Sequence, residues 1–357
     1  MYSNLIKYGF SDRFEKEAAL YGNLYVARVT RQHHELYKVI GEHGEMNATV
    51  SGKFVLHAGG YADYPAVGDF VMIDRDDAES GNAIIHHILT RKSIFTRKTA
   101  GRTSDEQVVA ANIDTVFICI SLNADFNLRR IERYLTIAWE SKALPVVVLT
   151  KSDLCCDLED KLTEISAIAR GVDLVVCSAE NADGLNAVQA YVQPGKTIAF
   201  IGSSGVGKST LINRLIGEDV LVTKAIREGD DKGRHTTTFR QLILLPNGGI
   251  VIDTPGMREI GIYSGNLSRA FEDIEELALT CKYSDCVHIT EPGCAVRQAI
   301  ENGTLEAKRL ENYQKLRREM SYEGLNTRQL ENEKVNRMFG SKAEMKQAFK
   351  HIKGRKK

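Results

Sequence analysis

The chain has little that would attach it to a membrane or send it out of the cell. No apolar run in its 357 residues approaches the roughly 20 residues that a membrane-spanning helix needs. The N-terminus, Met1–Asn4, lacks the basic stretch and apolar core of a secretory signal. Seven cysteines in a long chain without a signal do not predict a disulfide framework. We therefore expect a cytoplasmic protein with no membrane attachment.

The chain also lacks an excess of either charge, because 47 Lys and Arg residues balance 47 Asp and Glu residues. This balance excludes a global field that would attract nucleic acid. The local exception is the C-terminus, where a basic tail faces only Glu344 as opposing charge. Such a tail is either solvated or an arm for an anionic partner. Its basic residues are Lys342, Lys346, Lys350, Lys353, Arg355, Lys356 and Lys357.

The length predicts two or three domains, and three blocks differ in pattern. The first, residues 1–99, contains short strand-like runs between residues 24 and 95, separated by glycine-rich turns. Several short strands in that space predict a small closed barrel of the OB or SH3-like type. Its aromatic residues could either stack on nucleic-acid bases or fill the core. They are Tyr37, Phe54, Tyr61, Tyr64 and Phe70.

The second block, residues 105–265, alternates apolar strands with helical stretches, which predicts a parallel sheet covered by helices on both faces. The glycine-containing segment 101–105 is predicted to link it to the barrel. After about residue 263 the strand pattern ends, and the third block, residues 266–357, is predicted to be helical. The expected strands are 114–120, 145–149, 174–176, 198–201 and 250–252, with helices over 128–141 and 158–170.

A phosphate-binding loop follows the apolar strand 198–201. The run Gly202-Ser203-Ser204-Gly205-Val206-Gly207-Lys208-Ser209 fits the pattern G-x-x-x-x-G-K-[ST]. Its glycines allow backbone N–H groups to approach phosphate oxygens. Lys208 supplies a charge for the β- and γ-phosphates, and Ser209 supplies a hydroxyl for Mg²⁺. The helix that opens at this point favours anions at its N-terminus.

The other parts of a GTP site are present in an unusual order. Asp253-Thr254-Pro255-Gly256 follows both the loop and a second apolar strand. Asp253 is therefore expected to meet Mg²⁺, and the Gly256 N–H is expected to contact the γ-phosphate. The guanine-specifying motif, Thr150-Lys151-Ser152-Asp153, and the supporting Ser178-Ala179 both precede the loop. Asp153 would accept hydrogen bonds from guanine N1 and N2, which adenine cannot donate.

One residue of the base motif departs from the usual pattern, because Thr150 stands where Asn is common. A hydroxyl is shorter than an amide and lacks its paired donor and acceptor. We therefore expect one contact, either to the base or to the phosphate loop, to be weakened. Guanine preference should depend mainly on Asp153.

A charged, glycine-containing stretch between residues 222 and 238 lies where a nucleotide-sensitive switch is expected. Thr237 is the favoured switch ligand for Mg²⁺. Met257 occupies the position at which many GTPases carry a water-orienting Gln, and an apolar group cannot orient water. Slow unaided hydrolysis is therefore expected. His235 is the nearest titratable residue that could assist, and the alternative is that it is an exposed loop histidine without a role.

A compact set of metal-binding residues lies in the third block. Cys281, Cys286, His288 and Cys294 offer three thiolates and one imidazole within fourteen residues. Such a closed set suits one structural Zn²⁺ and leaves no open position for catalysis. The remaining cysteines, Cys119, Cys155, Cys156 and Cys177, lie on or beside apolar strands and are expected to be inert.

Together these features resemble the circularly permuted ribosome-biogenesis GTPases, specifically the small-subunit-dependent GTPase A family. The resemblance rests on the order of residues 150–153, Gly202 to Thr210 and Asp253 to Gly256, on the segment 233–238, and on the cysteine-histidine set. It implies an OB-fold first block, a zinc-binding last block, and GTP hydrolysis that the small ribosomal particle stimulates late in assembly. It also implies rRNA contacts, and a catalytic part for His235. A monomer is expected.

Two other functions remain open from the residues. One is a non-ribosomal GTP-dependent switch that holds a protein partner through the barrel and the zinc domain. The other is a P-loop kinase, against which Asp153 and the turn after Asp253 argue, because a kinase would prefer ATP.

Overall fold

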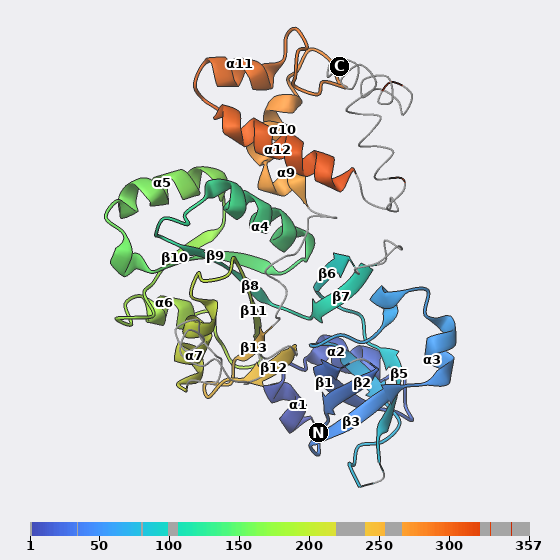
Figure 1. The fold of residues 1–357 in the computed structure, drawn as a ribbon. Coiled ribbons are helices and arrows are strands. Elements are labelled where there is room, and N and C mark those ends of the chain that lie inside the picture. Colours follow the sequence, from blue (N-terminus) through green and yellow to red (C-terminus); the bar gives the residue numbers. More distant parts are fainter. Residues whose placement is uncertain are drawn as a thin grey trace, which may run out of the picture.

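The computed structural model describes residues 2–33, 35–79, 81–98, 106–218, 240–253 and 266–321, together with residues 329 and 344. Figure 1 shows three regions stacked one upon another: a barrel next to the N-terminus, a central sheet with its helices, and a helical C-terminal region. This is the fold class that the sequence predicted. None of the helices within the described ranges is long and apolar enough to cross a membrane.

The first region is a five-stranded barrel, closed where β1 pairs with β4. All its neighbouring strands are antiparallel except β3 and β5, which are parallel and separated in sequence by helix α3 (Gly52–His57). Its core includes Val29, Val39 and Ile85, none of them exposed. Its strands are β1 (Tyr25–His33), β2 (Leu36–Ile40), β3 (Glu45–Val50), β4 (Phe70–Ile73) and β5 (Ala83–Ile88).

The aromatic residues of the barrel divide between the two roles considered for them. Tyr37 and Phe70 are buried and belong to the core. Tyr61, on the short 3-10 helix η1 (Tyr61–Asp63), is exposed, while Phe54 and Tyr64 are half-buried and meet edge to face. Two N-terminal helices, α1 (Ser3–Lys7) and α2 (Asp12–Ala18), close one side of the barrel through an apolar cluster.

The predicted linker at residues 101–105 lies outside the described residues, but the strands on either side of it pair with each other. β6 (Ile94–Lys98) and β7 (Glu106–Ala111) form an antiparallel hairpin. The segment therefore connects two strands of one hairpin, and the barrel reaches the sheet through the continuous stretch after β7. The sequence showed the turn residues but could not show that the two flanking runs pair.

The central sheet has four parallel pairs of strands in the order β10-β9-β8-β11-β13, and the antiparallel β12 follows β13. β12 also pairs with β1 at Arg31 and Gln241, so one sheet runs from the central region into the barrel. The strands are β8 (Thr115–Ser121), β9 (Leu144–Thr150), β10 (Asp173–Val176), β11 (Thr197–Ile201), β12 (Gln241–Leu244) and β13 (Ile250–Asp253).

Alternating residues of the buried strands serve two different cores, as the period of a strand requires. In β8, Ile118 and Ile120 join the cluster under α4 (Leu128–Glu140) and α5 (Leu158–Ile168). Phe117 and Cys119 point to the opposite cluster, which includes residues of α7 (Lys208–Ile216) and α6 (Leu185–Gln189). Both faces of the sheet are therefore covered by helices, as predicted.

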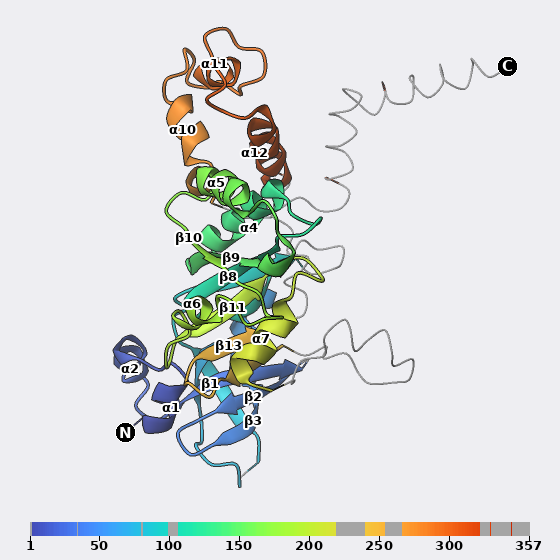
Figure 2. The ribbon, with the colours of Figure 1, turned by 90° about the vertical axis from the view of Figure 1, so that its left-hand side faces the viewer.

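The C-terminal region consists of helices that pack on α4, on the side away from the sheet. Figures 1 and 2 both show α4 and α5 between the sheet and these helices. Contacts run from α4 to both α9 and α12. The helices are α9 (Leu267–Ala270), α10 (Glu272–Ala278), α11 (Ala295–Glu301) and α12 (Ala307–Met320).

Candidate nucleotide site and candidate metal centre

The motif residues meet at one edge of the sheet, where the parallel strands end. β11 ends at Ile201 and leads into the glycine-rich loop, and β9 ends at Thr150, the first residue of the base motif. β10 leads to Ser178, and β13 ends at Asp253. In open α/β sheets, ligands bind at this carboxyl edge. The parallel order therefore brings together segments that lie about 100 residues apart in the chain.

The phosphate-binding loop requires its glycines. Gly202, Gly205 and Gly207 all have positive φ values, of 145°, 81° and 97°. A Cβ on Gly202 would lie 2.4 Å from the carbonyl oxygen of Cys119, so a larger residue does not fit there. Lys208 opens α7, and its Nζ donates to the carbonyl oxygens of Gly202 and Ser203, at 2.6 Å each. The ammonium group therefore lies over the loop.

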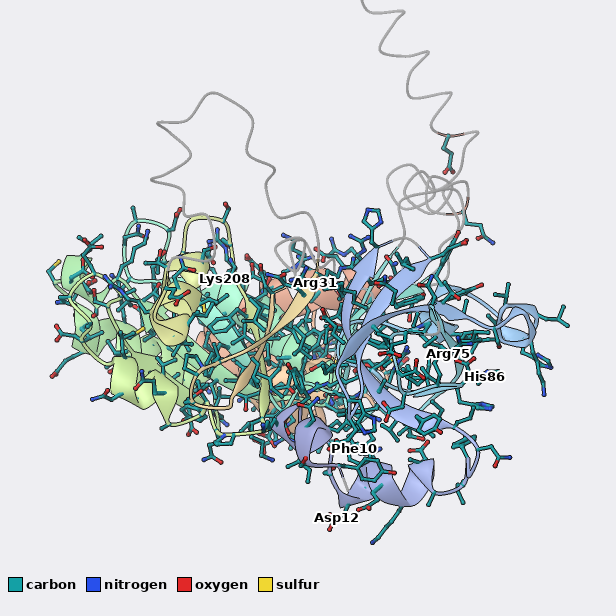
Figure 3. All side chains as sticks on the ribbon, turned by 90° about the horizontal axis from the view of Figure 1, so that it is seen from below. Phe10, Asp12, Arg31, Arg75, His86 and Lys208 are labelled. Atoms are coloured by element: carbon teal, nitrogen blue, oxygen red, sulfur yellow. The ribbon has the colours of Figure 1, made fainter. Side chains whose placement is uncertain are left out.

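Figure 3 places this loop within the whole molecule. Lys208 and Arg31 lie toward one side, and Phe10 and Asp12 of the N-terminal segment lie toward the other. The phosphate-binding side of the sheet therefore faces away from the two N-terminal helices.

Thr150 connects the base motif to the phosphate loop. Its side chain is buried, and its Oγ1 lies 2.6 Å from the carbonyl oxygen of Val206, with that of Ile120 as a second acceptor at 3.3 Å. The hydroxyl therefore makes the contact to the phosphate loop that the sequence left in doubt. Lys151 follows with a φ of 57°, and this left-handed residue turns the chain out of the strand.

The two base-site loops are joined to each other. The Ser178 hydroxyl donates a short hydrogen bond to Oδ1 of Asp153, and the Glu180 N–H donates to the Ser178 oxygen at 3.2 Å. In addition, the Ser152 N–H donates to the Cys177 carbonyl at 3.3 Å. These contacts fix the orientation of the Asp153 carboxylate, so the modest sequence signal at Ser178-Ala179 corresponds to a direct contact.

Arg214 is a member of the site that the sequence did not reveal. It lies on α7, and its Nε donates to the carbonyl oxygen of Ala179 at 3.0 Å. The helix that begins at the phosphate loop thereby holds the loop after β10. The only sequence signal is its position within the helix after Lys208, and nothing in the sequence identifies its partner.

A cavity with a volume of about 270 Å³ opens between the base motif and the phosphate loop. Its walls come from the ends of β9 and β10 and from the start of α7, so it lies where a purine would sit beside Asp153. Its lining residues are Thr150, Lys151, Asp153, Leu154, Cys177, Ser178, Ala179, Glu180, Gly207, Thr210 and Leu211.

Two of the strand cysteines are poorly suited to reactivity, because a thiolate is the reactive form. Burial raises the pKa of Cys119 to about 12 and that of Cys177 to about 11. Both thiols therefore stay protonated near neutral pH. Cys155 is half-buried and Cys156 exposed, so the expectation of inertness remains a prediction for them.

Several predicted residues of the nucleotide site lie outside the described residues: His235, Thr237, Gly256 and Met257, as do the basic residues of the C-terminal tail. Ser209 is the second residue of α7 and is half-buried. Asp253 ends β13, the strand next to β11. Ser209 therefore lies just after the phosphate loop that follows β11, and Asp253 ends the strand that pairs with β11.

The four predicted metal ligands come together in the C-terminal region. Their candidate ligand atoms all lie within 4.8 Å of one another. Cys281 Sγ is 3.9 Å from Cys294 Sγ and 3.7 Å from His288 Nδ1, and His288 Nδ1 is 3.4 Å from Cys294 Sγ. Tetrahedral zinc bonds would give separations of about 3.8 Å between two sulfurs and about 3.6 Å between sulfur and nitrogen. The cluster, with Cys286 as its fourth member, therefore fits zinc.

The chain resembles known proteins along nearly its whole length. A model of the family described as "RsgA GTPase" matches residues 88–263. The chain is 53% identical over 352 residues to "Small ribosomal subunit biogenesis GTPase RsgA 2" of Lactiplantibacillus plantarum, covering 99% of this chain and 98% of that one. It is 46% identical over 321 residues to "Small ribosomal subunit biogenesis GTPase RsgA 1" of Listeria innocua, covering 89% and 90%.

Two solved structures share the fold. The crystal structure of YjeQ from Thermotoga maritima is 30% identical, with a TM-score of 0.60, and the match covers 83% of this chain and 98% of that one. YloQ, described as a circularly permuted GTPase, matches with a TM-score of 0.57, covering 84% and 95%; at 23% identity it supports the fold alone. The family resemblance read from the motif order is thus confirmed, and the chain belongs to the RsgA GTPase family.

Proposed function

We propose that this GTPase acts in late maturation of the small ribosomal subunit, where it binds rRNA and is stimulated by the subunit. The observation that carries the proposal is that Asp153, Ser178 and the phosphate loop lie together at one edge of the sheet and line one cavity. The names of the relatives, "Small ribosomal subunit biogenesis GTPase", supply the particle. We also propose the division into domains at 1–99, 105–265 and 266–357.

Guanine selection would depend on the Asp153 carboxylate. Guanine presents two N–H donors, at N1 and N2, and ionised carboxylate oxygens can accept both. Ser178 donates to Oδ1 and so holds the plane of the carboxylate, while further lone pairs stay available to the base. Adenine presents no such pair of donors, and we expect GTP to be preferred over ATP.

The phosphates would lie on the loop before α7. The backbone N–H groups of residues 202–207 and the Lys208 ammonium group would bind their oxygens. Ser209, Asp253 and Thr237 are the residues proposed to hold Mg²⁺, which when bound with GTP neutralises charge on the β- and γ-phosphates. Hydrolysis by the isolated chain would be slow because Met257 cannot orient water, and His235 is the residue proposed to assist.

The two flanking regions would contact the particle. Basic groups contribute to rRNA affinity through phosphate contacts, and exposed bases can stack on aromatic side chains. Tyr61 on the barrel is exposed and meets this requirement, whereas Tyr37 and Phe70 are buried. A zinc ion held by Cys281, Cys286, His288 and Cys294 would stabilise the helical region, and the chain is expected to act as a cytoplasmic monomer.

Co-sedimentation tests the proposed function. The full-length protein would be mixed with purified small subunits, or with large subunits as the control, in a non-hydrolysable GTP analogue or in GDP. We expect it to pellet with small subunits in the analogue and much less in GDP. Equal recovery with both subunits, or no recovery with either, would favour a switch that acts on a different partner.

A further inference from the structure

The Thr150 hydroxyl donates its only proton within the protein. A hydroxyl carries a single O–H donor, and Thr150 Oγ1 lies 2.6 Å from the carbonyl oxygen of Val206 and 3.3 Å from that of Ile120. Both neighbours are acceptors, so either contact uses this proton. Thr150 nevertheless lines the nucleotide cavity, together with Asp153 and Gly207. It therefore offers a bound base lone pairs but no donor.

The Thr150 side chain is held in this orientation. It is 4% exposed, and a β-branched side chain has few rotamers. Val206 is buried as well, so its carbonyl oxygen would lose this donor if the hydroxyl turned toward the cavity. A buried acceptor without a donor is costly. The proton therefore stays on the phosphate loop when a base is bound.

Two other hydroxyls line the cavity, and neither replaces that of Thr150. The Ser178 hydroxyl donates to Asp153 Oδ1. Thr210 belongs to the first turn of α7, beside the phosphate loop, where the phosphates of a nucleotide would lie. Lys151 carries its donors at the end of a flexible stem, which fixes no direction for a hydrogen bond. Among the described residues that line the cavity, Asp153 therefore remains the side chain aimed at a base.

The part of guanine that would face Thr150 presents acceptors. With N1 and N2 on Asp153, the imidazole ring would extend toward the phosphate loop, because the ribose on N9 carries the phosphates. N7 of this ring is an acceptor, so a hydrogen bond to N7 needs a donor that Thr150 does not supply. An Asn at this position would supply one, because its amide carries two N–H donors, one for Val206 and one for N7.

We propose that this chain recognises guanine through N1 and N2 and leaves N7 without a hydrogen bond, and that Thr150 is the residue that sets this selectivity. The role given to Thr150 rests on the proposed function, because it takes Asp153 as the group that binds N1 and N2. The site should therefore accept guanine nucleotides that are altered at N7.

Binding of 7-deaza-GTP tests the inference directly. In this nucleotide a C–H group replaces N7, while N1, N2 and O6 are kept. The full-length protein would be loaded with a ribose-labelled fluorescent GTP analogue and Mg²⁺, and GTP, 7-deaza-GTP, ITP and ATP would compete for the site. We expect 7-deaza-GTP to bind within about twofold of GTP. A loss of about fivefold or more, the size of one hydrogen bond, would overturn the inference.

The other two nucleotides separate this inference from the proposed function. ITP lacks the 2-amino group and should bind about tenfold more weakly than GTP, since it loses a hydrogen bond to a charged acceptor. ATP should bind more weakly still. Equal binding of GTP and ATP would overturn the proposed guanine site, whereas discrimination against 7-deaza-GTP would overturn the inference alone.

Variants at Thr150 give a second test. The readout is the ratio of the affinities for GTP and 7-deaza-GTP, because damage to the fold would weaken both nucleotides equally. Thr150→Asn should favour GTP by about fivefold, since the amide adds a donor for N7. The matched control, Thr150→Ser, keeps a single proton and should keep a ratio of about one. An unchanged ratio in Thr150→Asn would overturn the assignment of this selectivity to Thr150.

Discussion

The two flanking regions are joined to the central sheet by buried charges of opposite kinds. At the barrel, Arg28 is almost fully buried, and within the described part of the chain its guanidinium donates hydrogen bonds to uncharged oxygens. These contacts are the carbonyl groups of Tyr8, Gly68 and Asn112 and the hydroxyl of Thr197. At the C-terminal region the buried group is the Glu132 carboxylate of α4, which contacts Arg129, Arg309 and Asn312.

The pKa values of the two buried arginines reflect this difference. Burial lowers the pKa of Arg28 to about 10, and the charges of Asp114 and Asp69 only partly oppose it. Burial also acts to lower the pKa of Arg309, but hydrogen bonds to Asp273 and the charge of Glu132 hold it above its usual value. Arg28 is therefore held by hydrogen bonds to uncharged groups, whereas Arg309 belongs to a network of ion pairs.

The difference indicates which junction can open. The barrel shares a sheet with the central region through β1 and β12, so its separation would also break main-chain pairing. The C-terminal region depends on side chains of α4 and on a single main-chain bond from Asn266 to Thr136 among the interactions described. We expect the barrel to move with the sheet, and the C-terminal region to be the part that can be released.

The largest expected effect is at the metal cluster. Cys281→Ala should release about one zinc ion and unfold the C-terminal region, because structural zinc contributes on the order of 10 kcal/mol to such folds. Elemental analysis and limited proteolysis would measure this, with Cys156→Ala as the matched control. GTP binding should be largely retained, since the central sheet does not depend on the metal. Full retention of zinc would count against the ligand set.

The next largest effect is at the ion network. Glu132→Ala leaves Arg309 without one of its buried partners and should destabilise the junction by about 3–5 kcal/mol. The matched control is Glu319→Ala, which removes the partly exposed partner of Arg133 and should cost under about 1 kcal/mol. Hydrogen exchange in α9 and α12 would report the loss. Unchanged protection in Glu132→Ala would show that packing alone holds the region.

Arg28 should have a somewhat smaller effect. Arg28→Met leaves buried oxygen acceptors unpaired, at a cost of about 1.5–3 kcal/mol. Chemical denaturation would measure it, with Arg31→Met on the same strand as the exposed control. Because β1 and β12 remain paired, barrel and sheet should still unfold together. Two separate transitions in Arg28→Met would instead show that the guanidinium alone couples them.

Between the two junctions lies Thr150, whose change should leave both intact. Thr150→Val removes the hydrogen bond to Val206 and should weaken GTP binding by about fivefold to tenfold, or about 1 kcal/mol. Thr150→Ser keeps the hydroxyl and serves as the control. Titration with a fluorescent GTP analogue would compare the variants. Equal affinity of both variants would mean that the contact is not needed for binding.

The sequence predicted the site better than it predicted the junctions. The phosphate loop, the base motif and the metal ligands carry local patterns, and each follows a strand or lies in a short run. Arg28 and Glu132 have no such pattern, because Thr197 lies 169 residues from Arg28 and Arg309 lies 177 residues from Glu132. The pairing of β6 with β7, on either side of the predicted linker at 101–105, was missed for a similar reason, since it depends on contacts that periodicity does not show.

The most direct test of the account is GTP turnover by the full-length protein with and without purified small ribosomal subunits. Phosphate release would be followed under multiple-turnover conditions, with large subunits as the control. We predict slow hydrolysis by the protein alone and an increase by orders of magnitude with small subunits only. Equal turnover with and without small subunits would contradict the account.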